Sequence, residues 1–284
     1  MTATAQKFLH DWGLSKAAAS AFASTQVIRK RRVAVQMPYG GFAPVPGGLL
    51  DRFNLDPVLS AALILLCAWQ LWTVRHCAVH RRPRQIVTLA GWLIAAGAFL
   101  SPLCALSVSL FSAHVAQDMI LVLVAAPLIA MAWPRTHASY HPGALWLAAS
   151  AFFLALWYWH MPIPYDETFK SVAVYWAMHI SLFGGGVWLW RELLQHDPER
   201  TAPVLAASML TFLQMALLGA VLTLAGRPLF QWHAVATEAW GLSRLQDQQL
   251  GGALMWAPGL ALFLWSALRS LGRLRASLER AHPA

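Results

Sequence analysis

The sequence predicts an all-α membrane protein, a polytopic helix bundle with about seven transmembrane helices. Of its 284 residues, 58% are hydrophobic and only 12% are charged, whereas soluble domains carry about 25% charged residues. Uncharged windows of about 20 residues, the length that crosses a bilayer core, recur along the chain. The 15 tryptophans and 13 phenylalanines fit the same environment, because aromatic rings gather where hydrocarbon meets water.

Seven spans are expected in order along the chain. The first begins at Asp56-Pro57, a favourable helix start. The second and third result from dividing an apolar stretch that is too long for one helix, at a break offered by Ser101-Pro102 and the serines that follow. The fourth ends at a turn with two prolines, the first of them Pro162. The predicted spans are residues 57–74, 86–107, 110–133, 143–160, 171–190, 203–225 and 248–268.

Basic residues in the short loops predict the orientation, because such loops stay on the cytoplasmic side. With the N-terminus outside and the C-terminus inside, the short outer loops carry only Lys170, Arg227 and Arg244. The cluster from Arg29 to Arg32 lies well before the first span, where the rule weakens. The inner side then carries Arg75, Arg81, Arg82, Arg84, Arg135, Arg191, Arg200, Arg269, Arg273, Arg275 and Arg280.

Three parts are expected. Residues 1–53 form an N-terminal extension, which is either a mobile, partly helical segment or partly non-native, since Met37 is an alternative start. Residues 54–270 form the transmembrane domain, and residues 271–284 form a basic cytoplasmic tail. The loop before the last span contains an amphipathic stretch, residues 228–240, interpreted as a short helix lying at the membrane interface.

Composition also disfavours several classes of function. The net charge of +9 comes from short basic clusters between apolar runs, which is typical of topology determinants and anionic-lipid contacts and not of a nucleic-acid interface. The three cysteines form no CxxC pair, so neither a disulfide framework nor a cysteine-based zinc site is indicated. No nucleophile-elbow or phosphate-loop motif is present, and no enzyme activity is predicted.

Ionisable residues inside the predicted spans are the candidate functional residues, because such groups are costly in a bilayer. His114 and Asp118 lie four residues apart on the third helix and therefore share one face. His179 lies on the fifth helix, and His160 ends the fourth. The predicted topology places all four in the outer half of the bundle. This arrangement suits a shared metal ion or a carboxylate that orients an imidazole.

Sulfur and polar side chains at the same depth extend this candidate site. Met255 lies on the seventh helix, and thioether next to imidazole favours copper over magnesium or calcium. Structural interpretations remain open: a lone transmembrane histidine is often a hydrogen-bond partner between helices, His160 could cap its helix, and methionines commonly pack. His233, in the outer loop near Glu238, could reach the site, but a solvated histidine is the preferred interpretation. Supporting positions are Asp247, Gln248, Met178 and Cys104.

Three separated motifs resemble the multi-spanning CtaG family of cytochrome c oxidase assembly proteins. The first runs from Phe111 through His114 and Asp118, with Ala-Ala-Pro-Leu following at 125–128. The second is Trp-His-Met-Pro at 159–162, followed by Tyr-Asp at 165–166, and the third covers 245–256. The resemblance extends from about Asn54 to Leu268. The family usually has His-x-x-x-His on the third helix, whereas this chain has aspartate at position 118.

The resemblance implies a bacterial inner-membrane factor that helps a haem–copper oxidase to mature, at the step that supplies or inserts copper at the outer face. Its expected partners are cytochrome c oxidase subunits and the lipid bilayer, with no nucleic acid. The aspartate is a harder ligand than histidine and could instead hold His114 in its tautomer. Two other functions remain open: a b-type haem protein with His114 and His179 as axial ligands, and a proton- or solute-coupled transporter using Asp118.

Overall fold

The computed structural model describes residues 43–76, 81–133, 143–194, 201–234 and 236–281. In these ranges all regular structure is helical. The elements are η1 (Pro46–Gly48), α3 (Pro57–Arg75), α4 (Arg81–Leu100), α5 (Pro102–Ser109), α6 (Phe111–Met119), η2 (Ile120–Ala125), α7 (Ala126–Ala132), α8 (Ala144–Trp159), α9 (Pro162–Thr168), α10 (Val172–Leu193), α11 (Thr201–Leu224), η5 (Trp232–Ala234), η6 (Thr237–Trp240) and α12 (Arg244–Ala281).

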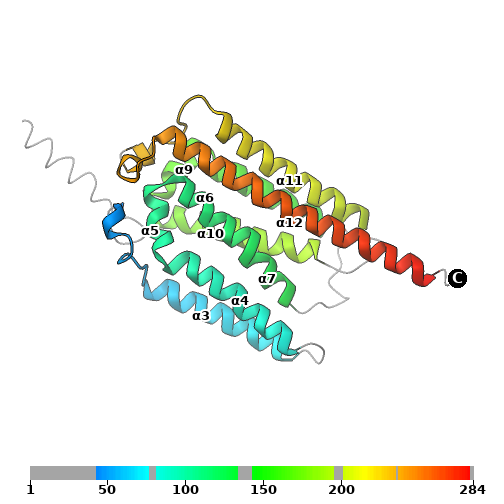
Figure 1. The fold of residues 1–284 in the computed structure, drawn as a ribbon. Helices are drawn as coiled ribbons and strands as arrows, with labels where there is room; N and C mark the ends of the chain where they lie inside the picture. Colours follow the sequence, from blue (N-terminus) through cyan, green and yellow to red (C-terminus); the bar gives the residue numbers. More distant parts are fainter. Residues whose placement is uncertain (1–42, 77–80, 134–142, 195–200, 235, 282–284) are drawn as a thin grey trace, which may run out of the picture.

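The long helices confirm a polytopic membrane bundle. Six segments are long and apolar enough to cross a bilayer, and α8 with α9, bent by 82°, can make a seventh span. The helices lie side by side, with α5, α9, η5 and η6 gathered at one end of the bundle (Figure 1). We call this the α5/α9 end. Helix α3 begins at this end and the C-terminus of α12 lies at the opposite one, as an odd number of crossings requires (Figure 1).

The third span, Phe111–Ala132, is the centre of the bundle. It is 72% buried inside the protein, whereas the other five candidate helices are 22–44% buried and expose apolar side chains to lipid. It packs against α4, α10 and α12. Most side chains on this span are therefore enclosed by protein.

Local sequence explains where several helices begin. Asp56 accepts a hydrogen bond from the Leu59 amide at 2.8 Å and precedes a proline at the first helical position of α3. Ser101 and Ser171 cap α5 and α10 in the same way. Helix α6 has no side-chain cap from its own neighbouring residues, and its cap comes from another helix, as described below.

The central span contains a π-helical turn, η2, directly before Pro127. In such a turn each amide bonds the carbonyl five residues earlier, and Ala126 N–H does bond Leu121 O. Pro127 has no amide hydrogen, so the carbonyl of Val122, five residues earlier, lacks its helical partner. The indole of Trp190 on α10 supplies it, donating from Nε1 to Val122 O at 2.8 Å.

Two expectations need correction. The break after the second span is two breaks, at Ser101 and Leu110, and α5 is a separate short helix between them. Residues 228–240 are not one interfacial helix but contain two short 3-10 helices, η5 and η6. The fourth span ends at Trp159, as expected, and the chain then turns into α9, which begins at Pro162. Residues 1–42, including Met37 and the Arg29 cluster, and the loop basic residues Arg135 and Arg200 lie outside the described residues.

Candidate functional site

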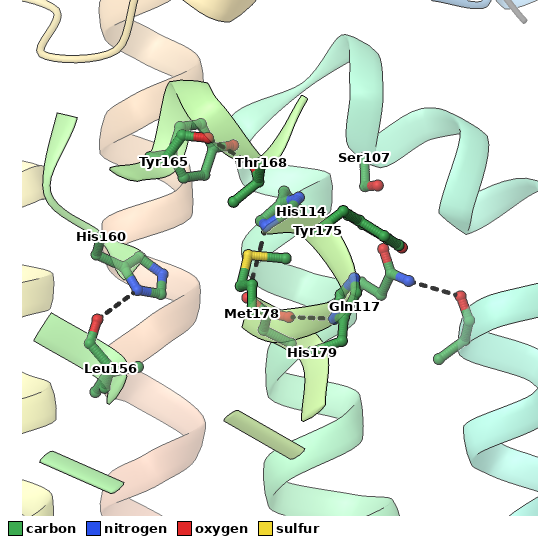
Figure 2. A network of polar contacts seen from close by, with 12 residues as sticks. Ser107, His114, Gln117, Leu156, His160, Tyr165, Thr168, Tyr175, Met178 and His179 are labelled. Atoms are coloured by element: carbon green, nitrogen blue, oxygen red, sulfur yellow. Dashed lines mark hydrogen bonds and ion pairs between the residues drawn. The ribbon is translucent and has the colours of Figure 1, made fainter. Parts of the chain in front are cut away.

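Three of the predicted residues, His114, Asp118 and His179, lie together where the central span faces α10. His114 Nε2 lies 3.7 Å from Asp118 Oδ2, and His179 Nδ1 lies 3.7 Å from Asp118 Oδ1. The two imidazole rings are 6.2 Å apart, centre to centre, and nearly parallel. All three side chains are almost completely buried. Figure 2 shows His114 and His179 on adjacent helices with dashed contacts to the carboxylate between them.

We call His114, Asp118 and His179 the trio. Several polar side-chain atoms of the trio make no hydrogen bond. Both ring nitrogens of His114, both of His179, and Asp118 Oδ2 are buried without a hydrogen-bond partner. Buried polar atoms are normally paired, so such a cluster calls for an explanation. A separation of 3.7 Å is too long for a hydrogen bond, but two ligand atoms on one tetrahedral ion, each about 2.1 Å from it, lie about 3.4 Å apart.

The described residues do not form a finished metal site, because no group of three or more His, Cys, Asp or Glu side chains among them is arranged to hold an ion. The chemistry of the trio nevertheless fits one. Two imidazoles and a carboxylate are common ligands of transition metals, and the ring nitrogens of both histidines and Asp118 Oδ2 make no hydrogen bond. Small side-chain movements toward a common point would complete the set.

Asp247 positions the helix that carries His114. From α12 its carboxylate accepts hydrogen bonds from the backbone amides of Phe111 and Ser112, at 2.7 and 3.0 Å, and from the Ser112 hydroxyl. A carboxylate at a helix N-terminus satisfies free amides and complements the helix dipole. The sequence predicted Asp247 as a supporting residue at the mouth of the site. In the structure it is the missing cap of α6, one turn before His114.

Gln248 supports the same end of the bundle. Its side chain accepts a hydrogen bond from Leu229 N at 2.7 Å and donates to Leu222 O at 3.2 Å. It therefore ties the loop after α11 to the start of α12. These bonds use both ends of the amide, and Gln248 makes no contact with the trio among those described.

Cys104 belongs to the surroundings of His179. Its sulfur lies 4.0 Å from Tyr175 Oη and accepts a hydrogen bond from Asn54 Nδ2 at 3.7 Å. The Tyr175 ring in turn packs against the His179 ring, with centroids 4.3 Å apart. Cys104 is fully buried on α5, and this tyrosine connects it to the His179 ring.

His160 and the two methionines lie farther from the carboxylate. His160 Nδ1 bonds the Leu156 carbonyl at 2.8 Å, in keeping with a helix-end residue, while its buried Nε2 has no partner. Figure 2 shows it set apart from His114, at the end of α8. Met178 and Met255 are buried in the main hydrophobic core, and Met178 lies beside the histidines in Figure 2.

His233 is the site residue that sequence reasoning missed. It was interpreted as solvated, but only 3% of its surface is exposed. Tyr165 Oη lies 2.7 Å from its Nε2, and its Nδ1 makes no hydrogen bond. Burial lowers the pKa of His233 to about 4, with the nearby backbone of Ser109 and Val108 opposing the shift, so the ring is neutral at pH 7. The aromatic residues Phe230 and Trp232 beside it in the sequence were the available indication of burial.

Comparison with known proteins gives one match. The family model described as cytochrome c oxidase caa3 assembly factor matches residues 64–144 and 138–276, which together contain every residue of the trio. No curated protein and no solved structure matches the chain.

Proposed function

Because the chain belongs to the family of cytochrome c oxidase caa3 assembly factors, we propose that it supplies copper to a haem–copper oxidase during assembly. The copper ion is cargo, held transiently by His114, Asp118 and His179 before transfer to an oxidase subunit. Membership of an assembly-factor family implies a role without catalysis. The proposed location is a bacterial inner membrane, with the α5/α9 end on the outer face.

One observation carries this proposal: two unpaired imidazoles face one carboxylate in the most buried span of the bundle. A purely structural histidine pair would be expected to hydrogen-bond across the helices. Here the distances to Asp118 are both 3.7 Å, and the four ring nitrogens make no hydrogen bond. These four nitrogens are therefore not occupied by hydrogen bonds within the protein.

Each member of the trio has a definite task in this proposal. Neutral imidazoles of His114 and His179 are ligands that suit copper. The Asp118 carboxylate offsets the positive charge of the ion, which is otherwise expensive to hold away from water. The structure brings Asp118 equally close to both histidines, which favours a position between them over a contact with His114 alone.

The outer-face assignment rests on charge distribution. Helix ends at the α5/α9 end carry few basic residues, namely Lys170, Arg227 and Arg244. The opposite end carries several, and short basic loops stay in the cytoplasm. Those at the opposite end include Arg75, Arg81, Arg82, Arg84, Arg191 and Arg269.

The haem alternative is less well supported by the geometry. Axial histidines of a b-type haem must lie on opposite faces of a porphyrin. His114 and His179 both approach the Asp118 carboxylate at 3.7 Å, so a carboxylate lies where the haem iron would have to lie between the two rings. A macrocycle between them would have to displace Asp118 from the centre of a packed span.

Metal content of purified protein tests the proposal. We expect wild type to retain copper, His114→Ala and His179→Ala to lose it, and Asp118→Asn to bind about 10- to 100-fold more weakly, as loss of a metal-site partner typically does. Asp118→His should be tolerated, because imidazole is another copper ligand. His76→Ala, an exposed histidine at the opposite end of the bundle, is the matched control.

The same variants should be examined in cells for the copper content of the oxidase. Oxidase should assemble without its full copper complement when His114 or His179 is lost, and added copper should restore part of it by mass action. Normal oxidase copper in the double histidine variant, with the protein present in the membrane, would rule out copper supply through this trio.

A further inference from the structure

The trio is covered on its outer side by aromatic rings from three separate segments. Phe111 of α6 stacks on Phe230 at 4.5 Å, and Phe169, which follows α9, stacks on Trp232 at 4.9 Å with the rings nearly parallel. Tyr165 of α9 packs against Phe111, Phe169 and Phe230. We call these five residues the aromatic roof. It closes the route from the α5/α9 end to His114.

His233 is embedded in the aromatic roof. Its ring contacts Tyr165 and Phe169, at centroid distances of 5.8 and 5.5 Å. The same two rings contact His114 from the other side, at 5.2 and 5.5 Å. His233 and His114 thus contact the same two rings, so one layer of side chains connects them.

We propose that His233 is the entry ligand of the site, which takes a copper ion arriving at the outer face and passes it through the aromatic roof to His114. This inference rests on the proposed function and extends it from storage to loading. In the closed structure the Tyr165 hydroxyl engages His233 Nε2, so loading begins when this contact opens. The transfer is a ligand exchange: the bond from the ion to His233 breaks as a bond to His114 forms, with no change in the charge of the ion.

The physical reason is the cost of moving a cation through apolar surroundings. Without His233, an ion passing the roof would leave water among the aromatic rings described above. Removing a charge from water without a partner carries a heavy free-energy penalty. A neutral imidazole halfway along the route offers a ligand at the point where hydration is lost, which lowers the barrier and leaves the final site unchanged.

A purely steric lid would behave differently, and two substitutions separate the cases. Tyr165→Phe keeps the ring of the roof and removes the hydroxyl that occupies His233. His233→Gln keeps a polar side chain that can still bond Tyr165 and removes the imidazole. If His233 is an entry ligand, the first change speeds loading and the second slows it. If the roof only blocks the route, weakening it by either change speeds loading or leaves it unaltered.

The experiment measures loading of silver(I), a redox-inert ion that binds imidazole nitrogen as copper(I) does, into the full chain in lipid nanodiscs. Protein is mixed with silver for set times and quenched with excess thiol, and the protected silver is counted by mass spectrometry. We expect His233→Gln to load roughly tenfold more slowly than wild type, a size typical of losing one metal-site partner, and to reach the same final stoichiometry. Tyr165→Phe should load several-fold faster.

Trp240→Phe is the matched control, because Trp240 fixes the same loop through a hydrogen bond to Pro44 O and does not contact the roof. It should load like wild type. Unchanged or faster loading by His233→Gln, with normal wild-type uptake, overturns the entry role alone. A wild type that takes up no silver overturns the copper function and the entry role together. Equal thermal unfolding midpoints establish that the variants are folded.

Discussion

Trp190 supplies a hydrogen bond to a backbone carbonyl that a proline elsewhere in the chain leaves without a partner. Its indole is fully buried and donates to Val122 O, the carbonyl left without a helical partner by Pro127. Trp190→Phe keeps most of the buried ring and removes the donor. We expect a loss of about 1–3 kcal/mol in the free energy of unfolding, the cost of an unpaired buried group, measured by denaturant titration in micelles.

Trp188→Phe is the control for this prediction. Trp188 lies two residues away on the same helix and is 36% exposed, so the same chemical change should leave stability nearly unaltered. Equal destabilisation by the two variants would mean that ring size, and not the bond to Val122 O, accounts for the effect.

The residues of the trio could be predicted from sequence because each is an ionisable group in an otherwise apolar span. The four-residue spacing of His114 and Asp118 gave their shared face, and topology gave the common depth of His179. The role of Asp247 could not be predicted, since its hydrogen bonds reach residues about 135 positions earlier. His233 was missed because residues in loops are usually solvated, and only tertiary packing encloses this one.

Helices α11 and α12 meet at a crossing of two glycines. A methyl group at Gly252 would lie 2.7 Å from Gly219 O and 2.8 Å from Thr223 N, and a methyl group at Gly219 would lie 2.8 Å from Gly252 O. Small residues allow helices to approach closely in a bilayer, where packing replaces the hydrophobic effect as the driving force. This pair of helices therefore depends on the absence of side chains at one point.

Gly252→Ala should force the two helices apart. Overpacking of this kind costs about 1–3 kcal/mol, and here the clashing atoms are backbone, which cannot rotate away. We expect a lower thermal unfolding midpoint. Gly272→Ala, farther along α12 where no atom lies within 4 Å of the added methyl, should be neutral or stabilise by about 0.5–1 kcal/mol. Similar midpoints for both variants would contradict the close crossing.

At the level of elements, hydropathy predicted the spans well and the interruptions poorly. Window averages detect about 20 apolar residues in a row but do not distinguish a straight helix from one that turns. Thus α9 and the π-helical turn η2 were not predicted. Helix α9 begins at Pro162, and η2 lies just before Pro127. Whether a proline ends, bends or widens a helix depends on which neighbour can bond the carbonyl that the proline leaves without a partner.

Basic residues are distributed unevenly along the long axis of the molecule and are concentrated away from the α5/α9 end. This predicts that the C-terminus is cytoplasmic. Alkaline phosphatase fused after Ala281 should be inactive, because the enzyme needs an oxidising compartment, and a fusion after Arg227 should be active. The opposite pattern would invert the membrane orientation and move the trio to the inner half of the bilayer.

The long-range cap of α6 has a consequence for how the protein is made. The backbone amides at the start of α6 donate hydrogen bonds to Asp247, which belongs to the last helix of the chain. They have no cap until that helix is in place. A ribosome delivers spans one after another, so His114 enters the membrane long before the residue that fixes its helix exists. A product that terminates early could insert its first spans and still lack an ordered trio. The start of α6 is therefore capped only after the whole chain has been made.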